Sequence, residues 1–237
     1  MNINKSKLIQ KVVAWDLYTR LFHWLLVFLI ISAWFTAEFG DMEMNWHKRN
    51  GYAIFILLVF RLLWGIVGSS TARFRRFIYS PAKAISYFKT LRKTSSDKYL
   101  GHNPLGSWMV LLLLFNLAIQ IGTGLFASDE LFAIGPLSDY VNEALARKFT
   151  LVHELNFFAL VVLIFLHISA VIMYLLFRKE NLIKPMISGK KPVKDYKDSN
   201  EASIAPLWLA IVCITIAIFV VALVITGFNL SALKPLI

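Results

Sequence analysis

Residues 151–177, LVHELNFFALVVLIFLHISAVIMYLLF, decide how this chain folds. The stretch holds one charged side chain, Glu154, and is long enough to cross a hydrocarbon core of roughly 30 Å. His153 and His167 lie fourteen positions apart. In a helix this is close to four turns, so both imidazoles project from nearly one face, roughly 21 Å apart along the axis. A histidine inside such a span is costly without a function or a partner. The alternative is that each histidine only bonds to a neighbouring helix.

The composition places the chain in a membrane. It has 237 residues, of which 58% are hydrophobic and only 16% charged. The net charge of +11 is therefore interpreted relative to the spans, as a sign of topology and not of nucleic-acid binding. The single cysteine, Cys213, excludes disulfides, thiolate zinc sites, iron-sulfur clusters and covalently attached c-type haem in this chain.

Five apolar runs predict an all-α membrane protein, with a transmembrane four-helix bundle and a fifth C-terminal transmembrane helix. The runs cover residues 21–37, 51–67, 105–126, 151–177 and 205–228. The segments before the first run, between the second and third, and between the fourth and fifth are rich in Lys and Arg, whereas the other two loops are acidic. The positive-inside rule therefore predicts a multi-pass protein of the bacterial cytoplasmic (inner) membrane, with a cytoplasmic N-terminus and a periplasmic C-terminus. The first run is interpreted as an uncleaved signal anchor.

Local signals refine this organisation. Asn103 followed by Pro104 is typical of a helix start. Gly122 and Gly124 offer close approach to a neighbouring helix or a flat ligand, or are plain packing sites. The basic loop over residues 73–93 is expected to form an amphipathic surface helix that contacts lipid headgroups. Residues 190–200 are interpreted as a flexible connector. The expected units are a domain over 1–180, a cytoplasmic linker over 181–203, and a helix with a short periplasmic tail over 204–237.

The predicted topology assigns a depth to each membrane histidine. His23 lies just inside the cytoplasmic edge of the first helix, and His167 lies at the same level. His47 stands at the outer start of the second helix, level with His153. Four histidines thus form two depth-matched pairs, and neutral imidazoles from facing helices are natural axial ligands for haem iron. The sequence predicts two bis-histidine b-type haems, with His23, His47, His153 and His167 as ligands, that suit electron transfer across the membrane better than oxygen activation.

Several cations lie near these expected sites. Arg61 follows His47 by fourteen positions, so we expect it beside the inner haem, where it could pair with propionates; the alternative is that it extends to the cytoplasmic edge. Arg20 and Arg49 are weaker candidates of the same kind. His102 has no partner at its depth and is interpreted as a loop residue, near a headgroup, propionate or quinone if it has a function.

The motifs in this sequence resemble those of the bacterial cytochrome b561 family, which includes the b-type cytochrome subunits of nickel-iron hydrogenases. The resemblance covers about residues 12–180 and rests on these motifs: Trp15-Asp16, Arg20, Phe22-His23-Trp24, His47 to Gly51-Tyr52, Arg61-Leu62-Leu63-Trp64-Gly65 and Gly101-His102-Asn103-Pro104. It implies a four-helix bundle with two b haems, ligated by histidines that match the four named above. It also implies electron exchange between the quinone pool and a partner redox protein, such as a hydrogenase or a periplasmic cytochrome c. The fifth helix departs from the family pattern.

The leading hypothesis is a di-haem electron-transfer subunit, in contact with lipid, quinone and a redox partner. An enzymatic alternative is a stand-alone quinone oxidoreductase, for example one linked to superoxide. A third alternative is a metal-ion transporter, which would favour acidic residues at mid-membrane, whereas only Glu154 lies near a span interior.

Overall fold

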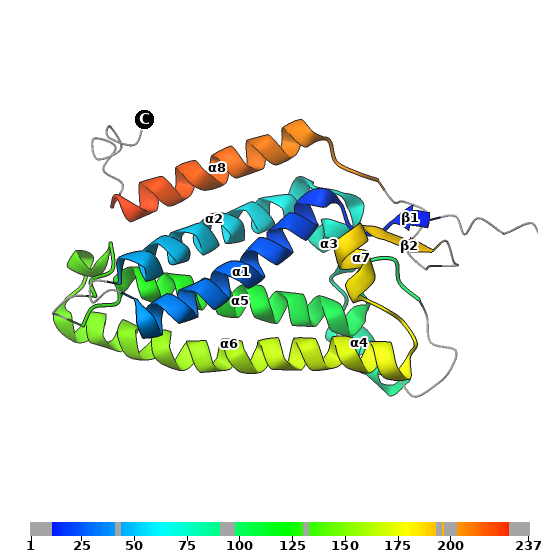
Figure 1. The fold of residues 1–237 in the computed structure, drawn as a ribbon, viewed down its shortest axis with the longest axis horizontal. Coiled ribbons are helices and arrows are strands. Elements are labelled where there is room, and N and C mark those ends of the chain that lie inside the picture. Colours follow the sequence, from blue (N-terminus) through cyan, green and yellow to red (C-terminus); the bar gives the residue numbers. More distant parts are fainter. Residues whose placement is uncertain are drawn as a thin grey trace, which may run out of the picture.

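The computed structural model describes residues 11–40, 44–90, 98–129, 133–192, 196 and 203–227. Five helices in this part of the chain are long and apolar enough to cross a membrane, which confirms the predicted all-α membrane fold. They run along the long axis of the molecule (Figure 1). Their bounds are α1 (Leu17–Phe39), α2 (Asn45–Val67), α5 (Pro104–Phe126), α6 (Glu143–Phe177) and α8 (Leu207–Ile225).

Side-chain caps fix where the first and third of these helices begin. The side chain of Asn103 accepts a hydrogen bond of 2.8 Å from the backbone N–H of Gly106, and Pro104 takes the first helical position, as the sequence predicted. Asp16 caps α1 in the same way, because its Oδ1 accepts from the backbone N–H of Thr19 at 2.7 Å. Each cap satisfies a backbone donor that the helix itself leaves unpaired.

Helix α6 begins well before the apolar run at residues 151–177. Asn142 caps it by accepting a hydrogen bond of 2.9 Å from the backbone N–H of Leu145. Its first two turns carry charged side chains, among them Glu143 and Arg147, which lie 4.0 Å apart across one turn. Hydrophobicity alone gives no signal for such turns, so the apolar run predicted only the membrane-spanning part of a longer helix.

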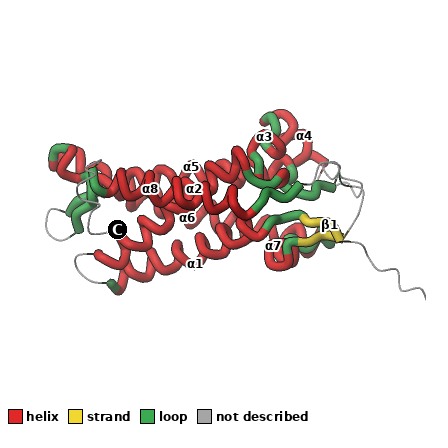
Figure 2. The backbone as a smooth tube through the Cα atoms, turned by 90° about the horizontal axis from the view of Figure 1, so that it is seen from above, coloured by secondary structure: helices red, strands yellow, loops and turns green. Residues whose placement is uncertain are grey.

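Two helical hairpins form the bundle. Helix α1 packs on α2, α5 packs on α6, and α2 also contacts α5. Helix α8 runs alongside α2, outside these four helices (Figures 1 and 2). The buried side chains of α8 are mostly small, and small side chains allow close packing between membrane helices. These side chains are Ala210, Cys213, Ala217 and Val221.

One end of the bundle carries most of the short elements (Figure 1). Strands β1 (Lys11–Val13) and β2 (Lys190–Pro192) pair there in antiparallel register. The prediction of a flexible connector over residues 190–200 is therefore wrong for residues 190–192, because they pair with the backbone of β1. Of the remaining residues of this predicted connector, only Tyr196 lies within the described part of the chain. The other short elements at this end are η1 (Ser70–Ala72), α3 (Phe74–Phe77), α4 (Pro81–Thr90) and α7 (Ile183–Ser188). Helix α4 confirms the helix that was predicted in the basic loop. The short helix η2 (Ser138–Tyr140) lies at the opposite end of the bundle.

Candidate functional site

His23 on α1 and His167 on α6 face each other, with ring centroids 6.4 Å apart. The Nδ1 atom of His23 is buried and has no hydrogen-bond partner. The pair lies toward the end of the bundle that carries α7, because the adjacent indole of Trp24 donates a hydrogen bond of 3.1 Å to the carbonyl of Met186. We call these two residues the first histidine pair.

His47 on α2 and His153 on α6 form the second histidine pair, with ring centroids 6.1 Å apart. Nδ1 of His47 donates to the carbonyl of Ala33 at 2.9 Å, and Nδ1 of His153 donates to the carbonyl of Gln120, also at 2.9 Å. A carbonyl can only accept, so Nδ1 carries the proton in both rings. Nε2 of each ring is thus unprotonated and has a lone pair that could coordinate a metal, although Nε2 of His153 accepts a hydrogen bond of 3.2 Å from Nε2 of Gln120.

Both separations fit two imidazoles that share one metal ion. A bond from a transition metal to an imidazole nitrogen is about 2 Å long, and the ring centre lies roughly 1 Å behind that nitrogen. Two rings on opposite sides of one iron therefore have centres roughly 6 Å apart, close to the observed 6.4 and 6.1 Å. The structure brings together the two pairs that depth predicted, while ligation of iron stays a prediction.

Two arginines near the first pair have buried donors without partners. Arg61 is only 3% exposed, so its side chain is buried within the protein. Its guanidinium lies over the ring of Phe74, 4.8 Å from the centroid, and its Nη1 has no partner. Arg20 donates from Nη1 to the carbonyl of Ile187 at 2.5 Å, but its Nε is buried and unpaired. Unpaired cationic donors are what the propionate groups of a haem would satisfy.

His102 is enclosed by aromatic rings. It lies in the loop before α5, as predicted, with its ring centroid 4.4 Å from that of Phe77 and 4.7 Å from that of Trp15. Burial, together with the positive charges of Arg61 and Lys191, lowers its pKa to about 3. The imidazole is therefore neutral at physiological pH, and its Nδ1 is a fourth buried atom without a partner, beside those of Arg20, His23 and Arg61.

Glycines give access to the second pair. A Cβ on Gly124 would lie 2.8 Å from Cε1 of His153, so only glycine leaves room for this imidazole. Gly51 follows His47 by one turn on the same face of α2, and a Cβ there would meet no atom within 4 Å. The space beside His47 is thus open to a flat ligand. Gly122 likewise has no neighbour within 4 Å, and so does not contribute a close helix contact.

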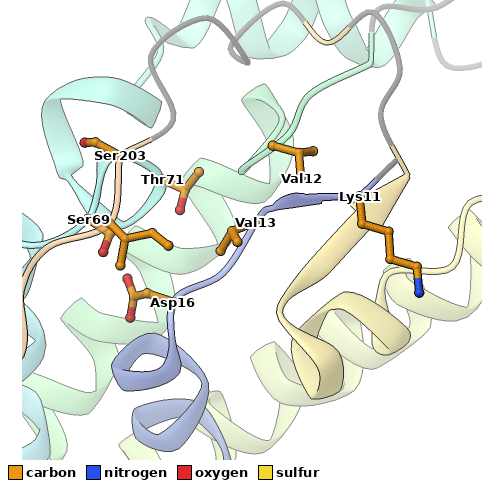
Figure 3. A pocket seen from close by; sticks show the side chains of 8 residues that line it. Lys11, Val12, Val13, Asp16, Ser69, Thr71 and Ser203 are labelled. Carbon is orange, nitrogen blue, oxygen red and sulfur yellow. The ribbon is translucent and has the colours of Figure 1, made fainter. Parts of the chain in front are cut away.

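The remaining arginine candidate contacts Trp46, and one cavity lies near β1. Arg49 is exposed and packs on Trp46, with Cζ 4.9 Å from the ring centroid. A cavity of about 270 Å³ lies where β1 approaches η1 and the start of α8, and Figure 3 shows Asp16 and Ser69 on its wall. None of the four paired histidines lines this cavity.

Sequence reasoning missed a set of amide side chains beside His153. Asn116 and Gln120 on α5 and Asn156 on α6 hydrogen-bond to one another inside the apolar bundle. The amide Nε2 of Gln120 also lies 3.2 Å from Nε2 of His153. The available signal was the recurrence of polar residues at positions 116, 120 and 123, which share one face of an otherwise apolar helix.

Membrane helices with facing histidine pairs define the class of multi-pass membrane cytochromes. Residues 14–189 match the family described as prokaryotic cytochrome b561, and the chain belongs to this family. A relative from Rhizobium leguminosarum bv. viciae, described as a probable Ni/Fe-hydrogenase B-type cytochrome subunit, is 24% identical over 80% of this chain and 92% of its own length. A protein of the same description from Bradyrhizobium diazoefficiens is 23% identical over 78% of this chain and 87% of its own length. The chain is a membrane b-type cytochrome of electron transfer, and its cofactor is haem b.

Proposed function

We propose that this chain binds two b-type haems and passes electrons between the quinone pool and a partner redox protein. The observation that supports it best is the presence of two facing histidine pairs, with ring centroids 6.4 and 6.1 Å apart. His23 and His167 would hold one haem, and His47 and His153 the other. Haem iron supplies reversible one-electron transfer when it is bound between two imidazoles.

The residues of this chain would hold, orient and tune the cofactors. In the second pair, the hydrogen bonds from Nδ1 to the carbonyls of Ala33 and Gln120 fix the tautomer and the direction of each Nε2. Near the first pair, the unpaired donors of Arg61 and Arg20 would bind propionate carboxylates, and their charge would favour the reduced state of that haem. His153 and His167 share the continuous helix α6, so one rigid element would set the spacing between the two haems.

The distribution of basic residues among the loops supports an orientation of the chain in the membrane. The end of the bundle with β1, α3, α4 and α7 would face the cytoplasm, because its loops hold most of the basic residues. Helix α8 then ends on the periplasmic side. An alkaline phosphatase reporter fused after residue 237 is expected to be active in intact cells, and an inactive, stably expressed fusion would contradict this topology.

Helix α4 supports a lipid contact on the cytoplasmic face. It exposes the apolar side chains Ile85 (58%) and Phe88 (63%) next to Lys83 and Lys89. Such a helix would place its apolar side chains at the bilayer boundary and its lysines on anionic headgroups. Native mass spectrometry of the full chain should detect anionic lipids that a Lys83→Gln/Lys89→Gln variant no longer retains. Equal retention by the two chains would contradict the contact.

The proposed redox partner is a hydrogenase, by similarity to relatives described as Ni/Fe-hydrogenase B-type cytochrome subunits. Identifying the proteins that co-purify with the chain in mild detergent tests this partner. A periplasmic cytochrome c in place of a hydrogenase would correct the partner and leave the haem assignment unchanged.

A spectroscopic experiment separates the proposed function from its alternatives. We expect the purified full chain to show a reduced-minus-oxidised b-type spectrum and to be reduced by a quinol analogue, with sustained turnover only when a redox partner is added. Sustained quinone turnover by the isolated chain would favour the stand-alone oxidoreductase. Bound metal without porphyrin would favour the transporter, although the described residues contain no group of three or more His, Cys, Asp or Glu side chains suited to a metal ion.

A further inference from the structure

A chain of three amide side chains connects the interior of the bundle to His153. Nδ2 of Asn116 donates a hydrogen bond of 2.8 Å to Oδ1 of Asn156. Nδ2 of Asn156 in turn donates to Oε1 of Gln120 at 2.7 Å and to the backbone carbonyl of Asn116 at 3.0 Å. We call Asn116, Gln120 and Asn156 the amide network. It joins α5 to α6 across a part of the bundle that is otherwise apolar.

Gln120 contacts both ring nitrogens of His153. Its backbone carbonyl accepts from Nδ1 at 2.9 Å, and its side-chain Nε2 donates to Nε2 at 3.2 Å. The carboxamide is oriented for this donation because Asn156 holds its oxygen. One turn further along α5, Gly124 leaves the space that the imidazole fills. Gln120, Asn156 and Gly124 together therefore set the position of His153 before any metal binds.

We propose that the amide network is a positioning device for His153 and that it tunes the haem held by the second histidine pair. The inference rests on the proposed function, in which Nε2 of His153 coordinates iron. With iron held at Nε2, the Gln120 carboxamide would give up its contact with that nitrogen and keep its hydrogen bond to Asn156. The bond from Nδ1 to the Gln120 carbonyl would make the imidazole a stronger electron donor and so lower the reduction potential.

The simpler explanation is that the network only holds two helices together. Polar side chains commonly do this in membranes. Helix adhesion alone does not require one residue to contact both nitrogens of a candidate ligand. The first pair provides an internal contrast, because Nδ1 of His23 is buried without a partner and no amide network adjoins it in the described part of the chain. A positioning role therefore predicts effects on one haem only.

The test uses the full-length chain loaded with haem, and the variants Asn156→Leu and Gln120→Met, which remove the amides at similar volume. Potentiometric titration, the electron paramagnetic resonance spectrum of the ferric haems and the rate of haem loss to a scavenger are the readouts. We expect one haem to be lost roughly 10 to 100 times faster. Its potential should become more positive, because α5 without these bonds to α6 holds the backbone carbonyl of Gln120 less firmly against Nδ1 of His153. The other haem should be unchanged, and Asn116→Leu, which acts through Asn156, should have a smaller effect.

Tyr174→Phe is the matched control. It removes hydrogen bonds that the α6 hydroxyl makes with Nδ2 of Asn103 and with the hydroxyl of Tyr87, at 2.9 and 3.2 Å, without touching a paired histidine. Wild-type potentials and haem retention in both Asn156→Leu and Gln120→Met would overturn the proposal, as would equal changes in both haems. If neither variant assembles, Asn116→Leu decides by the same readouts. Failure of the proposed function is distinguishable, because His153→Ala would then retain both haems.

Discussion

Gly124 on α5 leaves the space in which the imidazole of His153 on α6 lies, since a Cβ at this position would be 2.8 Å from Cε1 of the ring. The Gly124→Ala substitution should therefore displace the imidazole and weaken haem binding at the second pair. We expect about one haem to be lost on purification, while the haem at the first pair is retained. Gly122→Ala is the control, because its Cβ would meet no atom within 4 Å. Haem content that is equal in the two variants would contradict the assignment.

Arg61 should raise the reduction potential of the haem at the first pair. Its guanidinium is buried, and Arg61 follows His47 by fourteen positions on α2, which is the depth expected for the first pair. At an effective dielectric constant of about 20, a unit charge within roughly 10 Å contributes about 1 to 2 kcal/mol. The Arg61→Leu variant should lower the midpoint potential of one haem correspondingly. Arg49→Leu, at an exposed site on Trp46, should leave both potentials unchanged.

The proposed role of Arg61 would be contradicted if a folded Arg61→Leu variant showed the same two midpoint potentials as the wild-type chain. An Arg61→Lys variant adds a second comparison, because it keeps the charge but loses the planar donors that bind carboxylates in two places. We expect its potential to lie between those of wild type and Arg61→Leu. Potentiometric titration with optical detection measures all three chains.

Helix α8 should stabilise the protein through the buried face that carries its small side chains. Ala217 is fully buried in the core that α8 shares with the bundle, whereas Ile218, next in sequence, is 50% exposed. Ala217→Phe should overpack the α2–α8 contact and cost about 1 to 3 kcal/mol. Thermal loss of the haem absorption band in detergent should then occur at a lower temperature. Ile218→Phe is the control, and identical melting of the two variants would indicate that α8 does not pack as described.

The sequence predicts the spans, the start of α5 after Asn103 and the matching depths of the histidines, because each depends on local properties of the sequence. Apolar runs and basic loops give the spans and depths, and the Asn103-Pro104 pair gives the helix start. Depth in the membrane predicts that His23 can pair with His167. That the two rings face each other also requires the rotation of α1 and α6, which the structure supplies.

The contacts that the sequence does not predict depend on how elements are placed relative to one another. The bond between Asn156 and Gln120 requires the rotation of α5 against α6, and the enclosure of His102 requires the position of α3. Pairing of β1 with β2 joins segments about 180 residues apart, in strands too short and too charged to have a hydrophobic pattern. The polar residues at positions 116 and 120 of α5 indicate a buried face, but they do not indicate that Asn156 of α6 is their hydrogen-bond partner.

The haem content of the four histidine variants tests the central claim most directly. Pyridine haemochrome assay of the purified wild-type chain should give about two b haems per chain. His23→Ala and His167→Ala should each retain about one haem, and His47→Ala and His153→Ala should each retain the other, with the two classes distinguishable by reduction potential. A full haem complement in all four alanine variants would contradict the assignment of these histidines as ligands.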